Sequence, residues 1–140
     1  MKLQSIIQVG AGSGLGAVAR YLLQQLLAVA GLSLFPLATL LANLLGCLLI
    51  GLLAGRCAGV HADSRDAGRW HFWITGVCGG FTTFSTFSSE VLTMMLEGRG
   101  SLAGLYAGVS LGLGIFATWA GLSYSLARKS HVEESADELG

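Results

Sequence analysis

The chain has 140 residues, a net charge of zero, 53% hydrophobic residues and only 11% charged residues. Soluble domains carry about 25% charged residues, so this chain has too little charge to cover a water-exposed surface and is predicted to be an all-α membrane protein. The eight basic residues are scattered and form no stripe that could follow a phosphate backbone, which excludes nucleic acid as a partner. The 21 glycines, against a single proline, indicate membrane helices that pack closely.

Four membrane-spanning segments are predicted in chain order. The first covers residues 4–30, and the second covers residues 35–55 with Pro36 in its first turn, where a helix tolerates proline. After a charged loop at 56–69, the third span covers 70–97 and the fourth 102–127. Residues 1–127 therefore form one predicted transmembrane domain, and the polar, acidic tail at 128–140 is expected to be frayed and solvated.

The N-terminal segment and the cysteines indicate neither a cleaved signal peptide nor a zinc-binding or disulfide-bonded protein. The first apolar stretch has no short core ending in a cleavage site, so it is expected to stay in the protein. Cys47, Cys57 and Cys78 have no CxxC spacing and no histidine at ligand distance, and they are interpreted as packing residues rather than as zinc ligands or disulfides.

Basic residues predict the orientation of the chain, since an even number of spans places both termini on one side of the membrane. Six basic residues fall on the terminus side and one or two on the other, depending on Arg20. The positive-inside rule then predicts that the termini face the cytoplasm.

The middle of the third span is poor helix material. Gly79-Gly80 is followed by six hydroxyl side chains in the eight positions from Thr82 to Ser89. A helix broken in mid-membrane is therefore predicted. The N–H and C=O groups that such a break frees can bind ions. A kinked helix whose hydroxyls bond back to the preceding turn is the alternative.

Other polar side chains are predicted to lie within the membrane. Asn43 is one turn after Thr39 on the second span and serves either a ligand or a neighbouring helix. Tyr106 and Ser110 share one face of the fourth span, while Gly104, Gly108 and Gly112 form a second face predicted to be a packing seam. Two phenylalanines among the hydroxyls either face lipid or offer their positive ring edges to an anion; they are Phe84 and Phe87.

Two ionisable residues lie within the spans. Arg20 in the first span is a functional candidate, with snorkelling to the near interface as the alternative. Glu90 in the third span is either functional or an acid kept neutral or paired near the interface.

The chain is not expected to be an enzyme, because no nucleophile, base and orienting group come together. A line of hydrogen-bond donors within the membrane, with one cationic side chain near the pore entrance, suits the binding of a small, strongly hydrated anion. Four helices seldom enclose a pore, so an oligomer is expected. The predicted donors are the Arg20 guanidinium, the Asn43 amide and the hydroxyls of Thr39, Ser85, Ser88, Tyr106 and Ser110.

Four motifs resemble those of the Fluc/CrcB family of bacterial fluoride channels. They are the helix 3 sequence from Gly79 to Glu90, the Gly-rich run ending in Ala19-Arg20-Tyr21, the Pro36-to-Gly46 pattern around Asn43, and Tyr106 with Ser110. The resemblance covers residues 3–127. It implies a multi-pass protein of the bacterial inner membrane, surrounded by lipid, that exports fluoride passively and reduces fluoride toxicity.

The resemblance also implies an assembly and site roles. It implies an antiparallel, dual-topology homodimer with two pores and a central structural Na⁺ held by the backbone carbonyls of Gly79 and Thr82. It implies that Phe84 and Phe87 line the pores, that Asn43 faces the ion, and that Ser110 and Tyr106 continue a polar track. It implies that Glu90 and Arg20 stand near the pore entrances or support them.

Two features depart from the family pattern. Gly114 occupies a position one turn after Ser110 where a further hydroxyl is expected, so the polar track is predicted to be shorter here. The basic bias of six to one or two is larger than dual insertion predicts. Either Asp63 and Asp66 partly neutralise the loop at 56–69, or the chain inserts one way and pairs with an oppositely oriented partner. Two other functional classes stay open at this point, namely a four-span proton-coupled exporter of lipophilic cations that uses Glu90, and a membrane assembly subunit.

Overall fold

The computed structural model describes residues 3–32, 36–57, 68 and 70–137, with residues 57 and 130–137 described by their backbone alone. Every element in this part is helical: α1 (Leu3–Val29), α2 (Leu37–Cys57), η1 (His71–Cys78), α4 (Gly79–Phe81), α5 (Phe84–Leu96) and α6 (Gly100–Asp137). Three segments are long and apolar enough to cross a membrane, namely Leu3–Val29, Leu37–Arg56 and Gly100–Lys129. An all-helical, multi-pass membrane protein is therefore confirmed.

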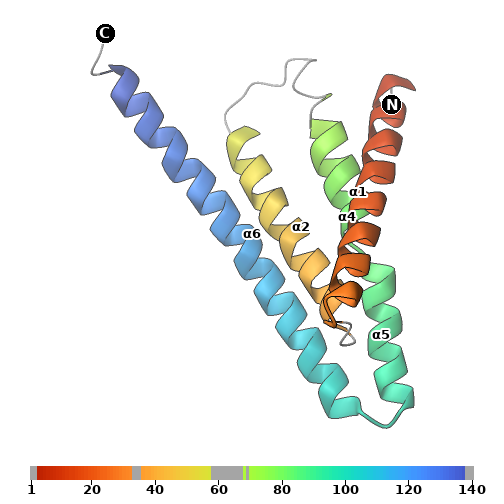
Figure 1. Ribbon diagram of the computed structural model, residues 1–140. Helices are drawn as coiled ribbons and strands as arrows, with labels where there is room; N and C mark the ends of the chain where they lie inside the picture. The colour runs from red at the N-terminus through yellow and green to blue at the C-terminus, as the bar shows by residue number, and fades with distance from the viewer. Residues whose placement is uncertain (1–2, 33–35, 58–67, 69, 138–140) are drawn as a thin grey trace.

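The helices are arranged as two close pairs joined by α5 (Figure 1). The long α6 lies along α2, and α1 lies along η1 and α4. Beyond α4, α5 continues in the same general direction and turns back into α6 at the lower end of the view (Figure 1). The start of α1 and the end of α6 lie at the same end of the molecule (Figure 1).

Glycines in the left-handed backbone region end two of the helices. After α1, Gly31 has φ 72° and the Leu32 N–H bonds the Leu27 carbonyl at 2.8 Å. After α5, Gly98 has φ 75° and the Arg99 N–H bonds the Met94 carbonyl at 2.9 Å. Only glycine adopts this conformation without steric cost, so both chain reversals depend on these positions.

Two helices begin or end at other residues than the predicted spans. The second helix begins at Leu37, and the Pro36 carbonyl accepts its first bond from Leu40 N at 3.1 Å. The last helix does not end at Ala127, because α6 continues to Asp137. Residues 130–137 contain no glycine or proline, and backbone hydrogen bonds need no apolar side chains, so the polar segment stays helical. The predicted loop at 56–69 lies mostly outside the described residues.

Close backbone contact at glycines forms the seam between α1 and the η1–α4 segment. A methyl group at Gly12 would collide with the Phe72 carbonyl, and one at Gly16 would lie 2.7 Å from Phe81 N. The seam between α2 and α6 is built in the same way, through Gly51 against the Thr118 carbonyl. Small residues let helix backbones approach closely and gain dispersion contacts.

The glycines predicted as a seam on the fourth span do not pack within the chain. A methyl group would meet no atom within 4 Å at Gly104, Gly108 or Gly112. The α2 contact uses another face of α6, which includes Gly121. The open face is available to lipid or to another chain.

Candidate functional site

The candidate site is built around an interruption between α4 and α5. Thr82 and Thr83 are both extended, with φ/ψ angles of −81°/157° and −146°/113°. Helical structure resumes at Phe84. Gly79 and Gly80 are themselves helical, so the extended residues follow the glycine pair rather than coincide with it.

Asn43 from α2 holds the extended Thr83 by both ends of its side-chain amide. The Asn43 Oδ1 accepts from Thr83 N at 2.8 Å, and Asn43 Nδ2 donates to the Thr83 carbonyl at 3.1 Å. This pairing replaces the helical bonds that an extended residue cannot make, which matters where no water is present to satisfy the backbone. Asn43 therefore joins α2 to the interruption, and these two bonds still leave part of its amide for a ligand.

The Thr83 hydroxyl begins α5. Its oxygen accepts from Thr86 N at 3.1 Å, which is the bond of a helix N-cap. The same hydroxyl donates to Thr86 Oγ1 at 3.0 Å and lies 3.2 Å from Ser85 Oγ. A single buried threonine thus organises the start of the helix.

These bonds remove the usual partners of two backbone carbonyls. In a continuous α-helix, Thr83 N bonds the Gly79 carbonyl and Thr86 N bonds the Thr82 carbonyl. Here Thr83 N is bonded to Asn43 and Thr86 N is bonded to the Thr83 hydroxyl. The carbonyl oxygens of Gly79 and Thr82 are thus among those that lose their helical donors at the interruption.

Arg20 reaches the end of α4 from α1. Its Nε donates to the Gly80 carbonyl at 3.5 Å, and the side chain is half-buried. A cation near the C-terminal carbonyls of a helix is electrostatically favourable. Arg20 is not among the residues that line the groove described next.

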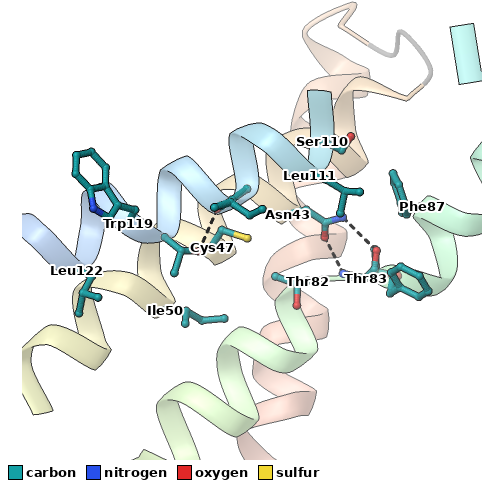
Figure 2. Close-up of a pocket in the computed structure, with 14 residues that line it drawn as sticks. Asn43, Cys47, Ile50, Thr82, Thr83, Phe87, Ser110, Leu111, Trp119 and Leu122 are labelled. Atoms are coloured by element: carbon teal, nitrogen blue, oxygen red, sulfur yellow. Dashed lines mark hydrogen bonds between the residues drawn. The ribbon is translucent and has the colours of Figure 1, made fainter. Parts of the chain in front are cut away.

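An open groove of about 650 Å³ runs between α2, α6 and the interruption. In Figure 2 the Asn43 amide points at Thr83 from one side, with Phe87 nearby, and Trp119 and Leu122 lie at the far end of the groove along α6. The groove brings together several predicted site residues from three elements: Asn43, Thr82, Phe84, Phe87 and Ser110.

The two phenylalanines of α5 differ in their surroundings. Phe84 is 77% exposed, while Phe87 is half-buried. The Phe87 ring lies 5.8 Å from the Phe84 ring and 5.3 Å from the Tyr106 ring. Phe87 is therefore fixed by the core of the chain, whereas Phe84 projects outward from it.

Glu90 does not stand alone in the span. Thr39 Oγ1 donates to Glu90 Oε1 at 2.6 Å, and the Tyr106 hydroxyl donates to Glu90 Oε2 at 2.8 Å. All three side chains are buried, with exposed fractions of 2%, 8% and 7% for Thr39, Glu90 and Tyr106. The cluster joins α2, α5 and α6, and it satisfies both carboxylate oxygens inside the protein.

Tyr106→Phe is expected to destabilise the fold by about 0.6 to 2 kcal/mol, because it removes one hydrogen bond to a buried carboxyl group between membrane helices. Tyr124→Phe is the matched control, since Tyr124 lies on the same helix and is 62% exposed. The measurement is the free energy of unfolding in mixed micelles. Equal stability of the two variants would contradict a stabilising role for the hydrogen bond.

The predicted hydroxyl groups of Ser110 and Ser88 differ from each other in that Ser110 lines the groove and Ser88 does not. Ser110 Oγ is buried and has no hydrogen-bond partner among the described residues. Ser88 is half-buried on α5 and is not among the residues lining the groove. Beyond Ser110 the groove passes Gly114, and the next hydroxyl, on Thr118, is bonded back to the Gly114 carbonyl at 3.0 Å. Among the described residues that line the groove, the unbonded hydroxyl group is therefore that of Ser110.

Three residues that contribute to the site were not predicted as site residues, and one of them, Cys47, was interpreted as a packing residue. Thr83 is central to the interruption, and Cys47 and Trp119 line the groove. The preference for threonine at a helix N-cap, just after a helix-breaking pair, is the signal that points to Thr83. The sequence offers no such signal for Cys47 or Trp119, whose positions follow from how α2 and α6 pack.

Known proteins are similar in sequence to this chain over most of its length. Residues 7–122 match the family model described as "CrcB-like protein, Camphor Resistance (CrcB)". A fluoride-specific ion channel FluC from Flavobacterium psychrophilum is 41% identical over 120 residues, which cover 86% of this chain and 95% of that protein. The FluC protein of Hyphomonas neptunium is 44% identical over 121 residues, covering 86% and 94%. The FluC protein of Nitratidesulfovibrio vulgaris is 41% identical over 123 residues, covering 86% and 95%. This chain therefore belongs to the CrcB-like family.

Proposed function

We propose that this chain forms a fluoride-specific channel that releases fluoride passively from the cytoplasm across the bacterial inner membrane and so reduces fluoride toxicity. The observation that carries the proposal is the groove, which combines hydrogen-bond donors with aromatic rings between membrane-spanning helices. The relatives named above, which are fluoride-specific ion channels by name, support the same function.

The groove offers fluoride the groups that a strongly hydrated anion needs when it loses water. A side-chain amide has two N–H groups. Among the described residues, Asn43 donates one of them to the Thr83 carbonyl, which leaves the second for an ion. The buried Ser110 hydroxyl, which lacks a partner among the described residues, is a further donor. The positive edges of the Phe84 and Phe87 rings complete the path. Thr39, Tyr106 and Glu90 form the buried wall that supports Phe87, and we place Arg20 and Ser88 toward the ends of the path.

We also infer that η1, α4 and α5 together form the third of four membrane crossings, interrupted in mid-membrane at Thr82 and Thr83. A structural Na⁺ fits this interruption. The Gly79 and Thr82 carbonyls have lost their helical donors, and Gly79 is exposed with no atom within 4 Å of a methyl group built on it. Oxygen atoms are the ligands that a hard cation prefers. When bound, the ion would neutralise the partial negative charge at this helix end.

The chain is proposed to act as an antiparallel dimer with two pores. A single chain leaves the groove open and Phe84 77% exposed, and a partner would cover both. The open glycines of α6 offer a surface for close approach: Gly104, Gly108 and Gly112.

The partner is proposed to be a second identical chain in the opposite orientation, or an oppositely inserted paralogue. For the identical pair, a C-terminal tag on the chain expressed alone is expected to be labelled from both sides of the membrane. Six basic residues lie on the terminus side and one or two on the other, which favours a single orientation and makes labelling from both sides a demanding test. Labelling from one side alone would exclude the identical pair and leave the paralogue as the partner.

Release of fluoride from liposomes tests the function. Purified protein is expected to release trapped fluoride under a valinomycin-clamped K⁺ gradient while trapped chloride is retained. Proton-driven uptake of a lipophilic cationic dye, without fluoride release, would support the exporter instead. That alternative needs Glu90 to face an open apolar chamber, whereas both its carboxylate oxygens are bonded to Thr39 and Tyr106. Neither activity would favour a non-transporting assembly subunit.

A further inference from the structure

Asn43 lies at the contact between two parts of the proposed channel, the groove and the interruption. Its side chain lines the groove, and its amide is bonded to the backbone of Thr83 on the other side (Figure 2). Resting on the function proposed above, we infer that Asn43 is a positioning residue for the Na⁺ site, acting through Thr83 rather than by contact with the ion.

Two acceptors compete for a single N–H group at the interruption. Thr83 N has two possible acceptors, which are the Gly79 carbonyl in a continuous helix and Asn43 Oδ1 in the extended form. The structure has the second, at 2.8 Å. As long as Asn43 holds this N–H, the Gly79 carbonyl accepts no helical hydrogen bond, and both its lone pairs can serve a cation.

The second Asn43 bond also favours the extended conformation of Thr83. Asn43 Nδ2 donates to the Thr83 carbonyl at 3.1 Å, so both polar groups of one residue are fixed from α2. Paired bonds of this kind resemble those between neighbouring strands, and they fit the extended Thr83 backbone angles of −146° and 113°. The extended backbone in turn lets the Thr83 hydroxyl take Thr86 N, which frees the Thr82 carbonyl.

Without the Asn43 amide, the extended backbone of Thr83 loses the bonds that hold it. An unbonded N–H group in a membrane interior is costly, and the nearest remaining acceptor for Thr83 N is the carbonyl that a helix would supply. Thr83 would then turn toward helical geometry and occupy the Gly79 carbonyl. The cation would have to displace this bond, so its apparent affinity would fall.

The test is the Na⁺ dependence of stability of the purified dimer. The thermal unfolding midpoint is followed by tryptophan fluorescence while Na⁺ replaces N-methyl-D-glucamine at constant ionic strength. Asn43→Leu, which removes both bonds, is expected to raise the half-saturating Na⁺ concentration by at least about tenfold, the scale of one lost buried hydrogen bond. Asn43→Asp, which keeps an acceptor for Thr83 N, is expected to stay within about threefold of native.

Leu45→Ala is the matched control, because Leu45 lies on the same helix and is 43% exposed, and its half-saturating concentration is expected to equal the native value. Where Asn43→Leu does not assemble, Asn43→Ser replaces it, since the shorter side chain cannot make both bonds. A folded Asn43→Leu or Asn43→Ser dimer with the native half-saturating concentration would overturn the inference. A native dimer that does not respond to Na⁺ would overturn the proposed Na⁺ site itself, and fluoride flux measured on the same sample would show whether the channel proposal stands apart from it.

Discussion

Asn43→Asp is expected to reduce fluoride flux by at least about a hundredfold, because a carboxylate in the groove repels the permeating anion. Two unit charges about 4 Å apart interact by about 4 kcal/mol at an effective dielectric constant of about 20. A repulsion of this size in the ion path lowers the rate by more than about a hundredfold. The substitution conserves the size of the side chain and retains an acceptor for the Thr83 N–H group. Fluoride efflux from liposomes, measured with a fluoride electrode, gives the rate.

The control for Asn43→Asp is the same change of amide to carboxylate at an exposed position. Gln25 on α1 is exposed and does not line the groove, so Gln25→Glu is expected to conduct at the native rate. The added charge is the same in both variants, and only its position differs. If Asn43→Asp conducted within threefold of native protein, Asn43 would not face the ion path.

Gly16→Val is expected to abolish assembly of the folded chain, with a destabilisation of about 3 kcal/mol or more. A β-carbon at Gly16 would collide with the Val77 carbonyl and lie 2.7 Å from Phe81 N. These are backbone atoms, so no side chain can move aside to make room, and α1 would have to separate from η1 and α4. The yield of monodisperse protein after size exclusion, together with its unfolding in mixed micelles, measures the effect.

Gly14→Val is the matched control for this substitution. Gly14 lies on the same helix, where a β-carbon would meet no atom within 4 Å, so the cost in helix propensity is shared by the two variants. Gly14→Val is expected to assemble as the native protein does. Equal loss of both variants would mean that the α1 seam does not depend on Gly16.

The hydropathy pattern predicted the membrane helices well because a membrane span depends on local composition. Three long helices coincide with predicted spans to within a few residues at their first ends. The end of the last helix could not be predicted in this way, because hydropathy reports where a chain leaves the membrane and not where its backbone bonds stop. The continuation of α6 to Asp137 is set by helix propensity instead.

Contacts between helices were less predictable, since they depend on the rotation of each helix about its axis. The first span contains two overlapping glycine patterns of equal strength, and only the one with Gly12 and Gly16 packs against η1 and α4. The Glu90 cluster has the same origin, because Thr39 and Tyr106 lie 51 and 16 positions away in the chain. The sequence identified the polar residues, while the packing decided which of them are partners.

The reversal potential of a planar bilayer containing the purified protein tests the central claim most directly. With fluoride on one side and an equal concentration of chloride on the other, a fluoride-specific path between Asn43, the α5 phenylalanines and Ser110 predicts a current carried by fluoride alone. The voltage at which the current reverses is then expected to move by about 59 mV for each tenfold change in the fluoride gradient, and to be independent of chloride. A reversal potential near zero under equal fluoride and chloride would contradict the account.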